Sequence, residues 1–375
     1  MAALDLLSGD AQTFVDKVWA SHILVHHTDP AILSGLLSLD DVDHLLTSTA
    51  LRAPALRIAK RGKVIAAKEF TRSAFLAGQP LTGLADARKV IDLFDDGATV
   101  VLQGLQRYWP PLTRLVRDLE LALGHPCQAN AYLTPPGSQG FAVHSDSHDV
   151  FVFQTHGTKQ WEVYDESGAR AVLLEPGVSM YLPTGTPHAA RAQETASLHV
   201  TVGINQVTWR EVLQRLSAAA LQDEAYDGRI PAGYLENPTG FAEQLAGRLS
   251  SLGERIAATD VEQAVAEQSH QFLTGRTPVL RGGLRDRLEL SRITDDTALE
   301  RRPAAACVLV VEEDRLRLLL GDREIRMPSR LEEPMRLVGE RTLLQPRDLC
   351  AWLDEESRLV LARRLVREGL LRVGR

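Results

Sequence analysis

The sequence predicts an α+β protein whose central part is an antiparallel β-barrel or sandwich. Short runs rich in β-branched and aromatic residues, separated by Gly and Pro turns, occupy residues 127 to 205. Strand signals stop after Asn205, and amphipathic helices follow. Beyond a linker rich in Arg, Gly and Pro, strands and helices alternate again. A chain of 375 residues suits two or three domains, in agreement with these changes of pattern.

The N-terminal part of the chain, from about residue 10 to 125, mixes helix and strand patterns. Apolar residues recur at helical spacing from Leu39 to Leu46 and again from Leu112 to Leu123. Between them, the run from Ala98 to Leu102 is typical of a strand. The five runs that predict the strands of the barrel come next, at 150–153, 161–164, 171–174, 178–182 and 198–202.

The C-terminal part is predicted to begin with three helices. The first contains Trp209, Val212, Leu213 and Leu216, and the other two span 241–256 and 261–272. After a linker at 274–285, we expect strands at 307–311 and 316–320, helices at 346–353 and 357–368, and a short strand at 370–373. The predicted domains are 1–205, 206–280 and 281–375.

Composition restricts the class of protein. The chain is 44% hydrophobic, enough for real cores, and its formal net charge of −7 argues against wholesale binding of nucleic acid. Its three cysteines form no CxxC pair, which favours a reducing cytoplasm over a disulfide scaffold or a cysteine zinc site. We see no secretory leader and no apolar run of the ~18–20 residues needed to cross a membrane. We therefore expect a cytoplasmic protein.

One motif carries most of the functional information. His144-Ser145-Asp146 is followed by His188, and two imidazoles with one carboxylate are the ligand set that holds Fe(II) on one face. If His144 and Asp146 lie in a strand, their side chains point to the same face and converge on one ion. The alternative is that these are unrelated loop residues, because short motifs match by chance.

The sequence around this motif resembles the JmjC-type cupin family, which includes the ribosomal oxygenases. The resemblance is carried by the stretch from Asn130 through the HxD motif to Gly157-Thr158-Lys159-Gln160-Trp161. It implies a double-stranded β-helix (jelly-roll) catalytic domain, Fe(II) at His144, Asp146 and His188, and 2-oxoglutarate as co-substrate. It also implies that Lys159 pairs with the distal carboxylate of 2-oxoglutarate, which needs a cationic partner when buried. The alternative for Lys159 is a solvated residue beside a turn.

Four further residues are candidates for the pocket by the same resemblance. Asn130 and Tyr132 share one face of the strand before HxD, and His199 and Thr201 share one face of a later strand. We expect them to contact co-substrate or substrate. Packing in the core is the alternative, above all for Tyr132 and His199.

The resemblance also implies a function for the whole chain. Ribosomal oxygenases are Fe(II)- and 2-oxoglutarate-dependent dioxygenases that hydroxylate an Arg or His side chain of a ribosomal protein. Their helical segment makes a homodimer, and the end of the present chain resembles a winged-helix domain. Three alternatives stay open: hydroxylation of a small molecule or a natural-product peptide, a zinc-dependent cupin hydrolase or isomerase, and a catalytically silent binding module.

Overall fold

The computed structural model describes residues 2–138, 143–166, 168–191 and 194–374. It divides into two compact units, Met1–Gln206 and Val207–Arg375. The finer division of the second unit near residue 280 stays a prediction.

The first unit is organised around two antiparallel sheets. In the larger sheet the strand order is β1 (Leu24–His27), β11 (Val178–Leu182), β8 (Asp149–His156), β13 (Ser197–Ile204), β7 (Cys127–Thr134), β6 (Thr99–Leu102), β2 (Leu56–Lys60) and β3 (Lys63–Val64). The smaller sheet has the order β10 (Gly168–Leu174), β9 (Lys159–Asp165) and β12 (His188–Arg191). All five strand runs expected between 150 and 202 are confirmed. Strands that follow one another in the sequence are divided between the two sheets, as in a barrel.

The central strands of the larger sheet are buried on both faces. In β8, Phe151 and Phe153 belong to the core beneath the N-terminal helices, while Val150 and Val152 belong to the core shared with the smaller sheet. Because neighbouring residues of a strand point to opposite faces, a nearly continuous apolar run is needed here. The pocket therefore lies on a sheet whose other face is fixed by packing.

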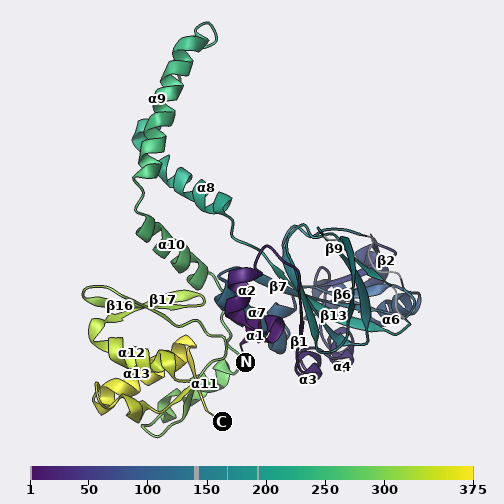
Figure 1. Ribbon diagram of the computed structural model, residues 1–375. Coiled ribbons are helices and arrows are strands. Elements are labelled where there is room, and N and C mark those ends of the chain that lie inside the picture. The colour runs from purple at the N-terminus through teal and green to yellow at the C-terminus, as the bar shows by residue number, and fades with distance from the viewer. Residues whose placement is uncertain (1, 139–142, 167, 192–193, 375) are drawn as a thin grey trace. The chain divides into compact units, whose positions relative to one another are not determined.

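Helices cover the outer face of the larger sheet. They are α1 (Ala3–Ser8), α2 (Ala11–Lys17) and α7 (Pro110–Leu123), which gather beside β7 in Figure 1. The ring of Phe14 lies 4.8 Å from that of Tyr181 and 5.3 Å from that of Phe151, so α2 packs directly on β11 and β8. The predicted helix at 112–123 is confirmed. It begins with proline at its first position and ends at Gly124, whose φ of +71° suits glycine.

The other helices and strands of the first unit come between β1 and β6 in the sequence. They are α3 (Pro30–Ser34), α4 (Leu39–Thr47), α5 (Ala67–Phe70), β4 (Thr71–Leu76), β5 (Gln79–Ala85) and α6 (Ala87–Asp95). The helix expected from Leu39 is α4, and a capping box between Ser38 and Asp41 fixes its start. Strands β4 and β5 form a separate two-stranded sheet, and β5 is also bridged to Arg52 through Leu84.

A buried carboxylate ties two parts of the first unit together. Asp149, at the start of β8, accepts hydrogen bonds from the Tyr181 hydroxyl and from both the backbone N–H and the hydroxyl of Thr184 (2.7 Å each). Thr184 lies in the connection from β11 to β12. Asp149 therefore couples the segment that follows Asp146 to the segment that precedes His188.

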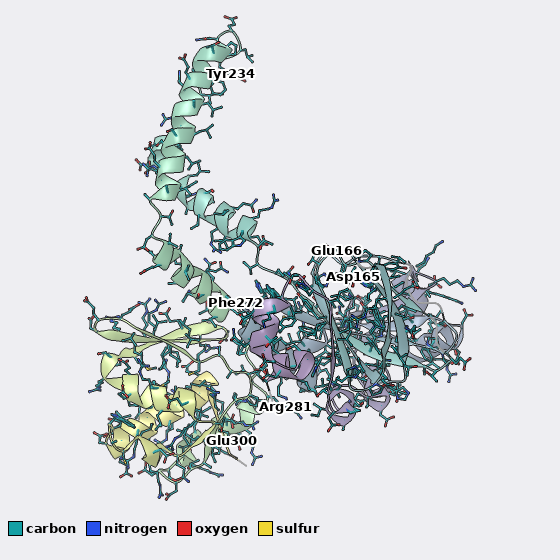
Figure 2. The ribbon with its side chains drawn as sticks, in the orientation of Figure 1. Asp165, Glu166, Tyr234, Phe272, Arg281 and Glu300 are labelled. Atoms are coloured by element: carbon teal, nitrogen blue, oxygen red, sulfur yellow. The ribbon has the colours of Figure 1, made fainter. Side chains whose placement is uncertain are left out.

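We expect Asp149→Ala to lower the free energy of unfolding of the first unit by about 3 kcal/mol, because it leaves buried donors without an acceptor. Urea unfolding followed by tryptophan fluorescence measures this. The control is Glu166→Ala, which removes an exposed carboxylate beside the β9–β10 turn (Figure 2) and should change stability by less than about 0.5 kcal/mol. Equal stabilities of the two variants would contradict the anchoring role of Asp149.

The second unit begins with the three expected helices, α8 (Trp209–Ala220), α9 (Pro238–Ala257) and α10 (Val261–Thr274). A capping box between Thr208 and Glu211 starts α8. None of these helices, which the structure describes in full, contains a buried residue. Tyr234, labelled in Figure 2, packs its ring 5.4 Å from that of Phe241 at the start of α9. The apolar stripes of these helices are therefore largely exposed.

The rest of the second unit is a mixed α/β region with its own core. Its elements are α11 (Gly283–Glu289), β14 (Leu299–Arg301), β15 (Val308–Val311), β16 (Arg315–Leu320), β17 (Arg323–Pro328), α12 (Glu332–Glu340), β18 (Leu343–Leu344), α13 (Glu355–Glu368) and β19 (Leu371–Val373). The strands form two three-stranded sheets, β18-β14-β19 and β15-β16-β17. Leu316, Met335 and Leu365 join sheet and helices in one hydrophobic cluster.

Most elements expected in this region are confirmed, but the helix expected at 346–353 is shorter than predicted, although it does begin with proline. Only a 3₁₀ turn, Pro346–Leu349, forms there. Asp354 accepts a hydrogen bond from the backbone N–H of Ser357 (2.8 Å) and so caps α13. Because an N-cap residue has an extended backbone, the preceding segment cannot run into α13 as helix.

Within the residues that the structure describes, no helix combines the length and the apolar character needed to cross a membrane.

Candidate metal centre

Three side chains of the first unit form a cluster suited to a metal ion. The potential ligand atoms of His144, Asp146 and His188 all lie within 4.8 Å of one another. The Nε2 atom of His188 is 3.7 Å from the Oδ2 atom of Asp146, and the two imidazole rings have centroids 4.4 Å apart. The structure thus brings the remote histidine to the HxD pair, as the ligand set requires.

The backbone explains how the two segments meet. His144 and His188 form an isolated antiparallel bridge, in which each backbone N–H donates to the other's carbonyl at 3.0 and 2.8 Å. The backbone N–H of Gly185 also donates to the carbonyl of Asp146 at 2.9 Å. These bonds hold the ligand-bearing segments side by side.

The expectation that HxD lies in a strand is wrong. Both His144 and Asp146 belong to the connection between β7 and β8. Pro135 and Pro136 follow β7 and have no N–H to donate, so regular pairing ends at Thr134. The pair converges because His144 is bridged to His188, the first residue of β12, and Asp146 is bonded to Gly185 in the β11–β12 connection.

Hydrogen bonding and burial prepare His188 as a ligand. Its Nδ1 atom lies 2.9 Å from the carbonyl oxygen of Thr186. A carbonyl can only accept, so Nδ1 carries the proton and Nε2 offers its lone pair. Burial, with a smaller effect of His144, lowers the pKa of His188 and outweighs the opposite effects of Thr186 and Asp146. The imidazole is therefore neutral at neutral pH, the form that binds metals.

A cavity of about 260 Å³ opens beside the cluster, and all eight candidate residues line it. Asn130 and Tyr132 of β7 face the cavity, while Ala129 and Ala131 face the core on the other side of the sheet. In β13, His199 and Thr201 face the cavity in the same way. The strand alternation expected from the sequence therefore holds for these four residues.

The four residues form two pairs of neighbours across β7 and β13. His199 lies opposite Tyr132, with rings stacked at 5.0 Å and an interplanar angle of 5°, and Thr201 lies opposite Asn130. The Oδ1 atom of Asn130 accepts a hydrogen bond from the backbone N–H of Gly104 at 3.0 Å. Burial, and secondarily Lys159, lowers the pKa of His199 well below its usual value. His199 is thus both packed and part of the pocket wall, and it stays neutral.

Lys159 is buried in the wall of the same cavity. Its side chain begins β9 and is 3% exposed, so the alternative of a solvated residue is wrong. Its Nζ atom donates to the hydroxyl of Thr134 at 3.2 Å, and Thr134 lies 3.2 Å from the hydroxyl of Thr99. No carboxylate of the described residues lies within ion-pairing distance of Lys159, and burial lowers its pKa to about 8. A buried ammonium with hydroxyl partners is suited to an anionic ligand.

Sequence reasoning missed several residues of the cavity wall. Thr134 has the same strand parity as Asn130 and Tyr132, so the pattern that identified those residues was sufficient to find it. Arg57 and Arg61 also line the cavity, but they come from the β2–β3 hairpin. No motif links that hairpin to HxD.

Comparison with known proteins agrees with this geometry. Residues 106–212 match the model of the JmjC domain. This central part of the chain is similar to the JmjC domain. The chain is 30% identical, over 67% of its length and 45% of the relative's, to a protein of Branchiostoma floridae named bifunctional lysine-specific demethylase and histidyl-hydroxylase NO66. It is 27% identical to ribosomal oxygenase 2 of Mus musculus, over 71% of this chain and 62% of that protein. The chain thus spans roughly half the length of the curated relatives it matches.

Solved structures share the fold of this chain. YcfD, a ribosomal oxygenase from Escherichia coli, matches with a TM-score of 0.57 at 16% identity, covering 98% of each chain. A structure of the same protein in complex with cobalt and 2-oxoglutarate matches with a TM-score of 0.56, over 96% of this chain and 97% of that one. The expected resemblance to JmjC-type cupins of the ribosomal oxygenase group is confirmed, as is a cupin fold of mixed α and β content.

Proposed function

We propose that this protein is an Fe(II)- and 2-oxoglutarate-dependent dioxygenase that hydroxylates an Arg or His side chain of a ribosomal protein. The observation that carries the proposal is a buried cation facing a metal-ligand cluster across one cavity. The buried ammonium of Lys159 is suited to binding an anion, and the side chains of His144, Asp146 and His188 are suited to binding a metal ion. A dicarboxylate that chelates a metal with one end meets both requirements.

The ligand set fits Fe(II) better than a structural metal. Two neutral imidazoles and one carboxylate leave coordination positions open, whereas structural zinc sites are closed by four protein ligands. When bound, Fe(II) would supply the redox chemistry that activates molecular oxygen. His188 would present Nε2 because Thr186 holds the proton on Nδ1.

Lys159 and Thr134 would hold the distal carboxylate of 2-oxoglutarate. The ammonium is positioned by the Thr134 hydroxyl, which in turn contacts Thr99. Val150, Val152 and Trp161 give the cavity apolar walls that exclude water. In the overall reaction, 2-oxoglutarate and O₂ are consumed, one oxygen atom enters a C–H bond of the substrate, and the other leaves in succinate with release of CO₂.

Tyr132 lines the cavity, and its hydroxyl is hydrogen-bonded to the side chain of Thr201. Burial raises the pKa of its phenol, and Asp146 adds to this rise, which outweighs the opposite effects of Arg57 and of the Thr201 hydrogen bond. The hydroxyl therefore stays protonated at neutral pH. We propose that Tyr132, Asn130 and Thr201 orient bound co-substrate or substrate, and that His199 supports Tyr132 by stacking.

The substrate class rests on the names of the relatives, which are ribosomal oxygenases and a histidyl-hydroxylase. Incubation of the protein with Fe(II), 2-oxoglutarate, O₂ and ribosomal subunits tests it. We expect one ribosomal protein to gain the mass of one oxygen atom, in step with succinate release. Coupling of succinate release to a small molecule, with no protein modified, would favour the alternative substrate class.

Further proposals concern the rest of the chain. We propose that α8, α9 and α10 form a homodimer interface, because Trp209 is 82% exposed and Leu249 and Val265 are also exposed on these helices. We also propose that residues 281–375 form a winged-helix-like domain. A cytoplasmic location accords with three free cysteines and a ribosomal substrate.

The pKa of Lys159 predicts how co-substrate binding depends on pH. The 2-oxoglutarate dianion pairs with the ammonium form, whose pKa is about 8 in the free protein. Affinity should be constant below pH 8 and should fall by up to about tenfold per pH unit above it, because binding must then take up a proton. Calorimetry with the Mn(II)-loaded protein measures this. In Lys159→Arg the guanidinium does not titrate, and the profile should be flat. A flat wild-type profile to about pH 9.5 would disprove the assignment.

A further inference from the structure

Two arginines of the β2–β3 hairpin line the cavity, and neither forms a salt bridge with a carboxylate among the residues that the structure describes, although Asp96 attracts Arg61 electrostatically. Arg57 lies in β2, opposite Val101 of β6, and its Nε atom is buried with no hydrogen-bond partner. Arg61 lies in the tight turn that leads to β3 and is exposed. The nearby Asp96 is already paired with Lys60, whose Nζ atom lies 2.5 Å from its Oδ2 atom. Both guanidinium groups are therefore available to a ligand.

The charges of the cavity wall are unbalanced. The described lining residues include three cations, Arg57, Arg61 and Lys159, and one carboxylate, Asp146. In the loaded pocket, a divalent metal and Lys159 together balance Asp146 and dianionic 2-oxoglutarate. The positive charges of Arg57 and Arg61 are then not balanced by any of these groups. A substrate that enters this cavity meets a positive field that Asp146 cannot offset, because metal binding occupies that carboxylate.

We propose that Arg57 and Arg61 are specificity-determining residues that select a peptide with a carboxylate beside an uncharged target side chain. The inference rests on the proposed function and narrows its substrate class. A substrate guanidinium would approach two like charges and find no carboxylate among the described lining residues, whereas a neutral imidazole meets no such penalty. Of the two target side chains, this geometry favours histidine.

The guanidinium of Arg57 is suited to this role by its shape. Its planar fork can bind both oxygens of a carboxylate, and its partial burial removes competing water. The hairpin also holds Arg57 in register, since β2 is paired with β6 on one side and with β3 on the other. Arg61 is free to adjust from the exposed turn. A substrate carboxylate would thus be fixed by one rigid and one mobile cation.

Fluorescence anisotropy on the Mn(II)- and 2-oxoglutarate-loaded protein, without oxygen, tests the proposal without relying on activity. The probes are three labelled peptides of equal length: a central histidine between two aspartates, the same histidine between two lysines, and a central arginine between two aspartates. We expect the first to bind at least about tenfold more tightly than either of the others. The preference should shrink as ionic strength rises.

Variants identify the residues responsible. In Arg57→Gln the preference should fall to within about threefold, and Arg61→Gln, an exposed change in a turn, should reduce it partly. Arg72→Gln is the matched control, because Arg72 is an exposed arginine of β4 that does not line the cavity. It should leave the preference unchanged. If the Arg57→Gln variant does not fold, the effect of Arg61→Gln on the peptide preference still tests the proposal.

Binding of Mn(II) and 2-oxoglutarate to the wild type, measured first by calorimetry, separates the two proposals. If neither binds, the proposed function fails. If both bind but the wild type shows no charge preference or binds none of the peptides, the selectivity proposal alone is overturned. A preference that survives both Arg57→Gln and Arg61→Gln overturns it equally.

Discussion

Replacing His188 with alanine will weaken metal binding in the pocket by more than about 100-fold and will remove turnover of 2-oxoglutarate. His188 is the ligand that comes from the far side of the cluster, and its Nε2 atom is held free by the hydrogen bond from Nδ1 to Thr186. Substituting residues that merely support a metal ligand typically weakens metal binding 10- to 100-fold. Loss of a ligand itself should therefore weaken binding by more than about 100-fold. His144→Ala should abolish oxidation for the same reason.

Mn(II) binding measured by calorimetry, together with succinate release, checks this expectation. His156→Ala is a suitable control, because His156 is an exposed histidine at the end of β8. It should bind Mn(II) as the wild type does. A His188→Ala protein that is folded, binds Mn(II) with unchanged affinity and releases succinate at the wild-type rate would remove the basis for the metal centre.

Lys159→Ala should strongly weaken co-substrate binding while leaving the metal in place. The variant leaves a buried carboxylate of 2-oxoglutarate without a counter-ion, and breaking a buried charge pair costs about 3–5 kcal/mol. That corresponds to a loss of roughly 100-fold or more in affinity. The apparent requirement for 2-oxoglutarate should rise accordingly, whereas Mn(II) affinity should stay the same, since Lys159 is not part of the ligand cluster.

Two further variants sharpen this test. Lys159→Arg keeps a cation and should retain part of the affinity, although the larger guanidinium must fit a site built for an ammonium bonded to Thr134. Lys17→Ala, which removes an exposed lysine from the same unit, should change nothing. If Lys159→Ala binds 2-oxoglutarate as tightly as Lys17→Ala does, another residue neutralises the distal carboxylate.

Strand periodicity in the sequence predicts much of this pocket. Asn130 and Tyr132, like His199 and Thr201, share a face because side chains alternate along a strand, and a buried antiparallel sheet preserves that alternation. The HxD pair and the remote His188, which the sequence predicts to share one metal ion, also lie close together in the structure.

Other features depend on tertiary contacts that sequence patterns do not encode. The HxD segment is held by a backbone bridge from His144 to His188, the first residue of β12, so the expected cluster forms without the regular strand that was expected at HxD. Arg57 reaches the cavity because β2 is the neighbour of β6 in the sheet, and no local pattern predicts that pairing. The segment at 346–353 has helical residues, but the cap of the next helix overrides them.

A crystal structure of the protein with Mn(II) and 2-oxoglutarate, grown without oxygen, tests the central claim most directly. We expect one ion, located by its anomalous signal, within about 2.2 Å of a nitrogen of His144, Nε2 of His188 and an oxygen of Asp146. The distal carboxylate of 2-oxoglutarate should lie within hydrogen-bonding distance of the Lys159 ammonium. An ion bound elsewhere, or bound by the HxD pair without His188, would contradict the metal centre on which this function depends.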